Sequence, residues 1–557
     1  MQKFQAGKME ILDYIVILMF CCGIVVAGLS FTRKGTDMKS FYAAGGFVPW
    51  WMAGLSLFMG FFSAGTFVVW GSIAYSHGFV SISIQMGMCI AGFGVALLIA
   101  PRWKRTRVLT VAEYINERLG GNTRVIYTYL FLLVSLFTTG AFLYPVAKIV
   151  EVSTGLSLQV AILLLGGIGI LYVAMGGLWA VLVTDVLQFV ILSAAVLIVV
   201  PLSFNKVGGI TAFVLQAPDN FFSPVNAEYT WAFLIAFCLY NFIFLGGNWG
   251  YVQRYTSVAT KTDARKVGLL FGCLYLICPL LWMLPPMIYR VCNGSLEGLA
   301  DEGAYLLMCK EVLPRGILGL MLGGMVFATI SSLNGALNIS SGVFTNDIYK
   351  RLNPNASNKK LMLTARLSTI GFGILAVIVA LLIPKMGGIV NVVISVAALT
   401  GVPLYLPVIW TLFSRRQNRH TVLATTLISL IINAIFKFIT PLFGFSLNRT
   451  QEMVVGVSVP VALLVICEIY FAIRKQEDEH AAFSEQMIAD RAFSQQDSEK
   501  AVANRYSFKV IGIGIALTGL MIMVLGMLTS GWTFWIVTGI GIILIALGIA
   551  ITLLTRK

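Results

Sequence analysis

The sequence predicts an all-α protein that crosses a membrane many times. Of its 557 residues, 58% are hydrophobic and 11% are charged, a balance that excludes an ordinary soluble domain. The mean hydropathy is +0.88. Apolar windows long enough to cross a hydrocarbon core of about 30 Å recur along the whole chain. We therefore expect an all-α polytopic membrane protein with roughly fifteen transmembrane helices.

The apolar windows give the expected helices in chain order. The first window is long enough to span the membrane and has no small-residue cleavage site, so we expect it to be retained. The first eight windows are 11–29, 48–75, 80–100, 125–149, 158–175, 178–200, 231–251 and 267–288. The other seven are 317–339, 361–383, 390–413, 422–443, 453–473, 510–528 and 532–554.

Lysine and arginine residues gather on alternate sides of the expected helices. With the N-terminus outside, the cytoplasmic side holds roughly 29 of the 39 Lys and Arg residues. Since short cytoplasmic loops collect these residues, we expect an outside N-terminus and a cytoplasmic C-terminus in the cell (plasma or inner) membrane. The net charge of +15 follows from this bias and does not indicate nucleic-acid binding.

The sequence offers little for enzymatic chemistry. The three histidines, His77, His420 and His480, lie near expected helix ends or loops without metal spacing, and no phosphate-binding loop is present, so we expect no enzyme. Of the nine cysteines, Cys292 and Cys309 share the loop between the eighth and ninth windows. An oxidising compartment would allow a disulfide there, and the sequence leaves a bridge or two free thiols as alternatives.

Two windows carry glycine and aromatic interruptions, at residues 49–71 and 239–254. Glycine relaxes a helix, and a break inside the membrane frees backbone groups that only a cavity or a ligand can use. The interrupted windows are the second and the seventh, and an offset of five windows inverts the orientation. This arrangement is typical of inverted-repeat secondary transporters, whose substrate and ion sites lie beside broken helices.

A third segment, residues 327–349, is unusually polar for the membrane, with Ser331, Ser332, Asn334, Asn338, Ser340 and Ser341. On a helix, Ala328, Ser331 and Ser332 share one face. Neutral hydroxyls together with a freed carbonyl suit a weakly held monovalent cation such as sodium. The alternative is that these serines only hold helices together.

Four motifs resemble the solute:sodium symporter family, which includes bacterial sugar, proline and sialic acid carriers and the mammalian sodium-glucose cotransporters. The motifs are TVAEYINERLG (110–120), GGLWAVLVTDVLQ (176–188), EVLPRGILGLMLGGMVFATISSLN (311–334) and TNDIYKR (345–351). The resemblance covers about residues 11–473. It implies a LeuT-type fold of two inverted five-helix repeats, with one extra helix before them and about four after them.

The resemblance and the composition together divide the chain into six regions. Residues 1–47 would hold the extra N-terminal helix and a cytoplasmic loop, 48–204 the first five-helix repeat and 230–413 the second, inverted repeat. Residues 420–473 would form two peripheral helices, 474–508 a charged and partly helical cytoplasmic connector, and 509–557 a C-terminal transmembrane hairpin.

The resemblance implies a sodium site where the first broken helix meets the polar segment. Its ligands would be the carbonyls of Met59, Phe62 and Ala328 and the hydroxyls of Ser331 and Ser332. Asp185 matches a family carboxylate on the ion's route toward the cytoplasm. Some members bind a second sodium through two further serines. Asn334 and Gly335 stand at those positions here, so we expect one sodium per cycle.

The resemblance also implies a solute cavity beside the two broken helices. Its lining would be Phe61, Ser63, Thr66, Gln85, Asn241, Phe244 and Tyr275. Gln85 and Asn241 each offer a donor and an acceptor, which suits hydroxyl or amide recognition. Phe244 would form an aromatic lid where sugar carriers often have tyrosine.

Other positions depart from particular family members. Tyr275 stands in place of the lysine of the bacterial galactose carrier, and Val393 falls near the position of a later glutamine. Thr138 or Thr139 lies near the place where the sialic acid carrier has an arginine. The known binding sets for these two solutes are therefore incomplete in this chain.

Together these observations predict a symporter in which inward sodium flow drives uptake of a small polar solute by alternating access. The solute remains open between a sugar or sugar derivative, which is favoured, a small carboxylate and an amino acid. A transporter-like membrane sensor is the alternative of another class, although the 474–508 connector is short for a signalling domain. Beyond the ion, the solute and the lipid bilayer, no obligate protein partner is indicated.

Overall fold

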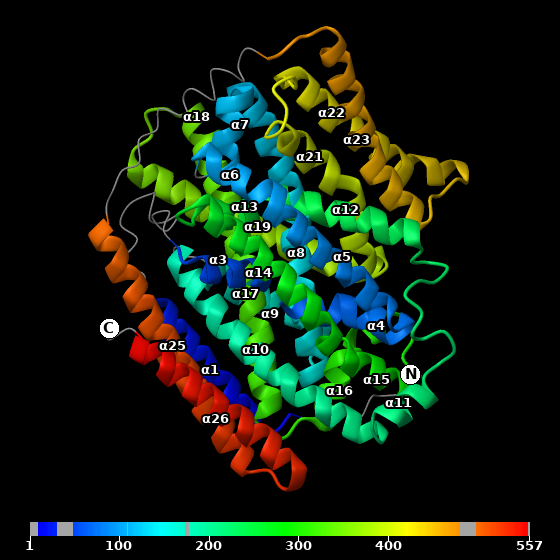
Figure 1. Ribbon diagram of the computed structural model, residues 1–557, viewed down its shortest axis with the longest axis vertical. Helices are drawn as coiled ribbons and strands as arrows, with labels where there is room; N and C mark the ends of the chain where they lie inside the picture. The colour runs from blue at the N-terminus through cyan, green and yellow to red at the C-terminus, as the bar shows by residue number, and fades with distance from the viewer. Residues whose placement is uncertain (1–8, 30–47, 109, 173–177, 479–496, 555–557) are drawn as a thin grey trace.

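The computed structural model describes residues 9–29, 48–108, 110–172, 178–478 and 497–554. Over these residues the protein consists of helices and their connections, apart from one isolated β-bridge between Val48 and Val258. The helices gather into one bundle (Figure 1). Segments far apart in the sequence lie side by side in it: α5 packs against both α12 and α14.

The helices follow the expected windows closely. The first half of the chain contains α1 (Ile11–Leu29), α3 (Trp50–Met59), η3 (Thr66–Trp70), α4 (Gly71–His77), α5 (Val80–Gly94), η4 (Val95–Ile99), α6 (Ala100–Thr106), α7 (Val111–Leu119), α8 (Gly121–Thr154), α9 (Leu158–Tyr172), α10 (Leu178–Val207), α11 (Ile210–Gln216), α12 (Trp231–Gly247) and α13 (Trp249–Thr256). The second half begins with α14 (Lys261–Trp282), α15 (Leu284–Cys292), η6 (Gly298–Gly303), α16 (Ala304–Val312), α17 (Ile317–Val343), η7 (Phe344–Tyr349), α18 (Lys350–Leu352), α19 (Asn358–Leu382) and η8 (Ile383–Met386). It ends with α20 (Ile389–Val396), η9 (Ala397–Gly401), α21 (Val402–Trp410), α22 (Arg419–Ala434), η10 (Ile435–Ile439), η11 (Thr440–Phe443), α23 (Arg449–Ile473), α25 (Asp497–Met527) and α26 (Gly531–Leu554).

The described residues include 11 helices that are long and apolar enough to cross a membrane, or 12 if the bent pair α12 and α13 is one span. Three shorter apolar helices, Ile11–Phe20, Trp50–Met59 and Leu158–Gly167, lie in the remaining expected windows. The protein is thus an all-α, multi-pass membrane protein, as the sequence predicted. The expected count of about fifteen includes these three short helices.

Both windows with glycine interruptions are broken. In the first, α3 ends at Met59 and the chain turns through residues 60–63 before it becomes helical again. In the second, α12 and α13 meet at Asn248 with a bend of 59°. The Asn248 side chain accepts a hydrogen bond from the amide of Gly250 (3.0 Å), so it caps the new helix and fixes the break at this residue.

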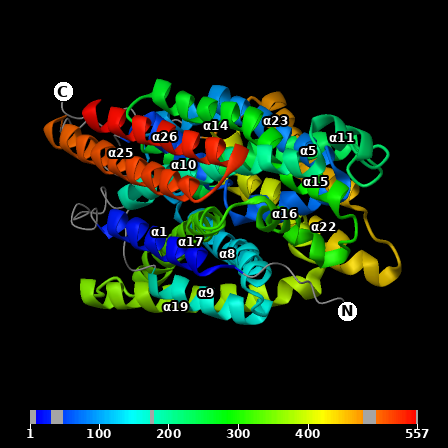
Figure 2. The same ribbon diagram turned by 90° about the horizontal axis from the view of Figure 1, so that it is seen from below.

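Helix α17 lies inside the bundle, packed against α1, α8, α10 and α19 (Figure 2). Its N-terminus is capped by Asp13 of α1, whose buried carboxylate accepts hydrogen bonds from the amides of Gly316 (2.7 Å) and Gly319 (3.0 Å). This position satisfies amides without helical partners and complements the helix dipole. The first helix therefore anchors α17 at one end.

The C-terminal helices α25 and α26 pair along their length, beside α10 (Figure 2). Their backbones approach closely at glycines: a Cβ atom added at Gly519 would lie 2.7 Å from the Gly541 carbonyl oxygen. Small residues at a helix interface allow such packing inside a membrane.

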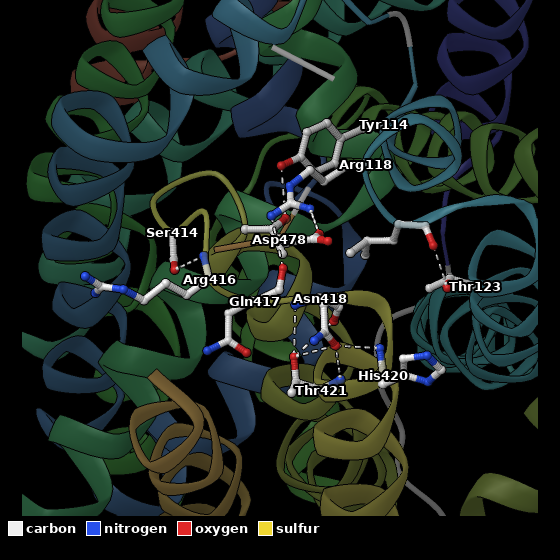
Figure 3. A network of polar contacts seen from close by, with 12 residues as sticks. Tyr114, Arg118, Thr123, Ser414, Arg416, Gln417, Asn418, His420, Thr421 and Asp478 are labelled. Carbon is white, nitrogen blue, oxygen red and sulfur yellow. Dashed lines mark hydrogen bonds and ion pairs between the residues drawn. The ribbon is translucent and has the colours of Figure 1, made fainter. Parts of the chain in front are cut away.

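A polar network joins the start of the expected connector to the bundle (Figure 3). The Arg118 side chain of α7 is buried, and its Nη1 contacts Asp478 Oδ2 at 2.5 Å while its Nη2 donates to the Gln417 carbonyl at 3.0 Å. The Asp478 amide in turn donates to the Arg415 carbonyl (2.9 Å). The connector is therefore fixed where it begins. Residues 479–496 lie outside the described part, and the connector becomes helical at Asp497, where α25 starts.

The two cysteines considered for a disulfide are both free thiols. Cys292 is exposed at the end of α15, whereas Cys309 is fully buried in α16. The structure therefore shows the free-thiol alternative.

Asp478→Ala should destabilise the protein by about 3 kcal/mol, because it leaves a buried guanidinium without its carboxylate. As a matched control, Glu10→Ala breaks the exposed pair in which Arg315 Nε lies 2.7 Å from Glu10 Oε1, and it should cost under about 1 kcal/mol. Thermal unfolding of the purified protein in detergent measures both effects. An equal loss of Tm in the two variants would contradict a structural role for the Arg118 network.

Candidate functional site

The backbone at the first break leaves carbonyl groups without their usual donors. In a continuous helix the Ser63 amide would bond the Met59 carbonyl, but here it donates to the Phe61 carbonyl (3.1 Å). The Thr66 amide likewise donates to the Ser63 carbonyl (3.0 Å) and not to that of Phe62. Met59 and Phe62, two of the predicted sodium ligands, have therefore lost their helical i+4 donors.

One side chain joins the break directly to α17. The Ala64 amide donates to Thr329 Oγ1 (3.0 Å), and this hydroxyl donates onward to the Met325 carbonyl (2.9 Å). Thr329 is 1% exposed, so the bond is shielded from water. Sequence reasoning missed Thr329, although it follows Ala328 in the ATISSL motif and carries the hydroxyl that such a contact requires.

The predicted ligands on α17 lie next to one another. Ser332 Oγ donates to the Ala328 carbonyl at 3.1 Å, which places two of the predicted oxygens on one face of the helix. Ser331 and Ser332 are partly exposed. The structure thus places the broken segment next to α17, the helix that carries the paired serines. The arrangement supplies several neutral oxygens and suits an alkali cation.

Asp185, the predicted exit-path residue, sits beside this cluster on α10. It is 6% exposed. Its Oδ2 accepts a hydrogen bond from Ser56 Oγ (2.6 Å), and its Oδ1 lies 3.4 Å from Ser331 Oγ. Ser56 also accepts from Arg254, at 3.4 Å from Nε and 3.3 Å from Nη2. One polar network therefore joins α3, α10, α13 and α17.

Ser56 and Arg254 were not predicted as site residues. Arg254 is the last residue of the second interrupted window, 239–254. A cationic side chain at the end of an apolar window is a signal for a functional site that the sequence does contain. Ser56 carries no such signal, because it is one small residue within an apolar stretch. The pairing matters because a carboxylate and a guanidinium at this depth balance each other's charge.

A cavity begins at these side chains. Its lining includes Asp185, Arg254, Ser331, Ser332, Thr138 and Phe244. The lining residues of α13 and α17 are partly exposed, so the cavity is not fully enclosed. Asp185 and the paired serines thus border an accessible space.

The predicted solute residues are mostly enclosed. Within the described part of the chain, Phe244 alone of the seven lines this cavity. Ser63, Thr66, Gln85, Asn241 and Tyr275 are each at most 3% exposed, while Phe61 is partly exposed. The structure therefore places most of this set inside the packed core in the conformation it describes.

Three of the enclosed polar side chains differ in their hydrogen bonds. Gln85 is hydrogen-bonded at both ends of its amide: Trp282 Nε1 donates to its Oε1 (2.9 Å), and its Nε2 donates to the Ser81 carbonyl (3.3 Å). Thr66 donates to the Phe61 carbonyl and so closes the turn at the break. Among the described atoms, Asn241 Nδ2 has no hydrogen-bond partner. A buried, unused donor of this kind is a candidate for ligand recognition.

Aromatic rings pack around the break. The ring centroid of Phe61 lies 4.9 Å from that of Tyr251 and 5.4 Å from that of Phe271, and the centroids of Phe62 and Trp282 are 4.6 Å apart. These contacts close the packing around the enclosed residues, whereas the cavity on the α13 side stays accessible.

Of the remaining positions considered in the sequence, some line the cavity and others do not. Thr138 lines the cavity, while Thr139 is buried and donates to a carbonyl of its own helix. Gly335 lines the cavity with open space beside it, and the side chain of Asn334 lies outside the described part. Val393 lies on α20.

Comparison with known proteins connects this geometry to a family. A sequence profile described as "Sodium:solute symporter family" matches residues 41–429, most of the chain. Sodium/myo-inositol cotransporter 2 of Mus musculus is 26% identical over 484 residues, covering 78% of this chain and 71% of the relative. Sodium/glucose cotransporter 1 of Ovis aries is 26% identical over 512 residues, covering 83% and 76%.

A solved structure shows the same fold. The structure described as the substrate-bound outward-open state of a Na+-coupled sialic acid symporter aligns with a TM-score of 0.68 at 23% identity, covering 83% of this chain and 98% of that one. All these similar proteins are transporters and not enzymes, in agreement with the prediction from the sequence.

Thr329→Val should weaken sodium binding by about tenfold, because the isosteric side chain leaves the Ala64 amide buried without an acceptor and loosens the break from α17. Thr329→Ser keeps the hydroxyl and should stay within about twofold of the parent protein. The sodium concentration that gives half of the maximal rise in Tm measures binding without transport. If valine and serine behaved alike, the hydroxyl contact would have no part in forming the site.

Proposed function

The chain belongs to the sodium:solute symporter family, and we propose that it imports a small, neutral, polyhydroxylated solute, a sugar or sugar derivative. Sodium-coupled symport across a membrane follows from the family, with sodium and a small solute as the transported partners. For this chain, one observation carries the sodium-coupled part of the proposal: the break after Met59 contacts the polar segment of α17.

We assign the sodium ion to the carbonyls of Met59, Phe62 and Ala328 and the hydroxyls of Ser331 and Ser332. Two observations support this set: the i+4 donors of the Met59 and Phe62 carbonyls bond elsewhere, and Ser332 Oγ lies 3.1 Å from the Ala328 carbonyl. An ion held by both segments stabilises their contact, because it binds only where the two meet. Sodium binding thereby favours the state of the bundle in which the break contacts α17 over a state in which the two are apart.

Release of the ion would follow the accessible cavity. Asp185 borders that cavity beside Ser331, so an ion leaving the serines meets a carboxylate before it reaches Arg254. The driving force is about 2.3 kcal/mol per 100 mV for each charge that crosses. We place the cavity on the cytoplasmic side, with the N-terminus outside and the C-terminus inside, in the plasma or inner membrane. The Lys and Arg distribution supports this orientation.

The charge balance of the accessible cavity favours passage of a neutral solute. Arg254 and Asp185 are the charged side chains that line the cavity in the described residues, and Ser56 links them. Each charge is therefore compensated within the protein. Asn241 supplies an unused amide donor, which suits a hydroxyl or carbonyl oxygen of a solute. The names of the glucose and myo-inositol cotransporters, to which the chain is similar, agree with such a solute.

We accordingly keep the seven predicted side chains as the solute set: Phe61, Ser63, Thr66, Gln85, Asn241, Phe244 and Tyr275. Since most are enclosed here, solute binding requires a different arrangement of the aromatic rings around the break. The two inverted repeats, residues 48–204 and 230–413, provide that rearrangement by moving relative to each other. A small carboxylate or an amino acid is the second candidate, because Arg254 lines the cavity and would pair with an anion if Asp185 were protonated.

Uptake into proteoliposomes should require an inward sodium gradient. Ser332→Ala should raise the sodium concentration for half-maximal uptake by about tenfold, because it removes one of the proposed ligands. Ser340→Ala, in a serine that donates to Ser135 on α8, is the matched control and should leave the sodium requirement unchanged. Equal uptake with potassium or with a proton gradient alone would refute sodium coupling.

A thermal-shift screen should separate the solute classes. A neutral hexose or cyclic polyol should raise Tm in sodium but not in potassium, since a ligand of the native fold stabilises it and sodium orders the site. A hexuronate and a neutral amino acid should have no such effect. In Asn241→Leu the polyol response should be lost while the sodium response remains. Stabilisation by the hexuronate alone would favour the carboxylate alternative.

A further inference from the structure

A second cavity, of about 430 Å³, lies between α8, α20, η10 and α23. This volume is within the usual range of sites that bind small molecules. The cavity shares Val134 of α8 with the accessible cavity described above, and its other lining residues are different. We name it the lateral cavity, and its lining includes Leu133, Phe137, Asn391, Thr400, Phe438 and Glu452.

The lateral cavity reaches the surface that faces the bilayer. Two of its apolar lining residues, Leu133 and Phe438, are 57% and 63% exposed. The spans that form one side of it lie at the edge of the bundle (Figure 1), and only 28% of the apolar window of Arg419–Phe443 and 22% of that of α23 are buried. Since exposed apolar side chains on such spans contact lipid, a ligand can enter this cavity from the bilayer.

The lateral cavity is long as well as large. Its lining follows the chain from Asn391, in the first turn of α20, to Thr400 in η9. At the helical rise per residue this is about 13 Å, nearly half of a hydrocarbon core of about 30 Å. The lining between these two residues is mostly apolar, with Val392, Val396 and Leu399. A space of this shape fits an acyl chain that runs from the end of α20 toward the middle of the membrane.

A local irregularity builds the inner wall of the lateral cavity. In the π-helical turn η9, the carbonyls of Ala398 and Leu399 accept hydrogen bonds from Asn433 Nδ2 of α22, at 3.2 and 3.1 Å. Asn433 is 6% exposed, so these bonds are shielded from water. Turns of this kind are rare and frequently mark functional sites. Leu399 and Thr400 of the same turn line the cavity, so its wall is held in place from a second helix.

Charged side chains lie in the lateral cavity near the ends of its spans. Lys437 Nζ is 2.7 Å from Glu452 Oε1 and 3.0 Å from its Oε2, and it donates to Ser395 Oγ at 2.9 Å. Arg449, at the start of α23, also lines the cavity and is held by Glu228, whose Oε1 is 2.6 Å from its Nη1. The cavity thus presents two cations and one carboxylate above an apolar interior.

We propose that the lateral cavity binds a phospholipid whose head group carries both a phosphate and a primary ammonium, as in phosphatidylethanolamine. The phosphate lies against Lys437 and Arg449, and the ammonium donates to Glu452. Each charge of the Lys437–Glu452 pair then keeps an opposite neighbour when the head group separates the two, and the acyl chain fills the apolar interior. This binding site goes beyond the proposed function, and it requires neither sodium nor solute.

The same charges discriminate against other common head groups. An anionic phosphoglycerol head group draws Lys437 toward its phosphate but offers Glu452 no cation in exchange. The quaternary ammonium of phosphatidylcholine has no N–H group, so it cannot donate a hydrogen bond to Glu452. We therefore expect the lipid with a primary ammonium to bind about tenfold more tightly than either of the other two.

Native mass spectrometry of the full-length, delipidated protein in detergent tests the site. The probes are phosphatidylethanolamine, phosphatidylcholine and phosphatidylglycerol with identical acyl chains, added without sodium or solute. Lys437→Gln/Glu452→Gln removes both charges together and leaves neither uncompensated. It should weaken binding of phosphatidylethanolamine about tenfold, to the level of phosphatidylcholine. The matched control, Lys206→Gln/Glu311→Gln, removes a Lys–Glu pair (2.5 Å) outside the lateral cavity and should leave all three affinities unchanged.

A second variant tests the apolar part of the lateral cavity. Leu133→Trp adds bulk from the exposed side of α8 and should weaken all three lipids by about tenfold, because the ring occupies the space of the acyl chain. Thermal unfolding verifies that each variant is folded, and Leu133→Trp alone decides if the double variant is not. Three outcomes overturn the proposal: equal affinities for the three head groups in the parent protein, tighter binding of phosphatidylglycerol, or unchanged binding of phosphatidylethanolamine in either folded variant.

Discussion

A span that breaks inside a membrane must find partners for backbone groups that no water can reach, and this constraint organises the centre of the protein. Between Met59 and Thr66 some backbone groups find side-chain partners, and others are left without their helical partners. The Ala64 amide donates a hydrogen bond to Thr329, and the Thr66 hydroxyl donates one to the Phe61 carbonyl. The Met59 and Phe62 carbonyls, in contrast, lose their helical donors. Oxygens left in this condition are what an alkali cation needs. The break therefore supplies both the oxygens of the proposed ion site and the contact with α17.

The same reasoning explains why the two charged groups nearby are joined by a hydroxyl. Asp185, Ser56 and Arg254 lie on three different helices, and each would be unfavourable alone at this depth. Joined through Ser56, they border the cavity with a balanced charge, next to Ser331. A change in the position of α3 would disturb the carboxylate and the proposed ion site at once, because Ser56 and Met59 are on the same helix. In the proposed site, that helix would therefore couple ion binding to the accessible cavity.

The sequence predicted the fold and the site to different depths. Apolar windows and glycine interruptions are local signals, so the helices and both breaks could be located from them. The motif around Ala328 pointed to a contact between this helix and the break, yet Thr329, one residue away, was missed because its role depends on an amide 265 positions earlier in the chain. Ser56 was missed for the same reason, whereas Arg254 had a signal in the sequence, a cation at the end of an apolar window. The enclosure of Gln85 by Trp282 is likewise a property of tertiary packing, which a pattern of residue types does not contain.

The network at Arg118 has a consequence for how the protein is made. Arg118 and Asp478 are 360 residues apart, and the bond between Tyr114 and Thr411 in the same region spans 297. At a synthesis rate of about 5–20 residues per second, Arg118 leaves the ribosome on the order of half a minute before its carboxylate exists. The earlier helices must be inserted and held during that interval by their own packing. Closure of this contact then marks a chain that is complete through α23, and a nascent chain that stops earlier leaves Arg118 without its carboxylate partner.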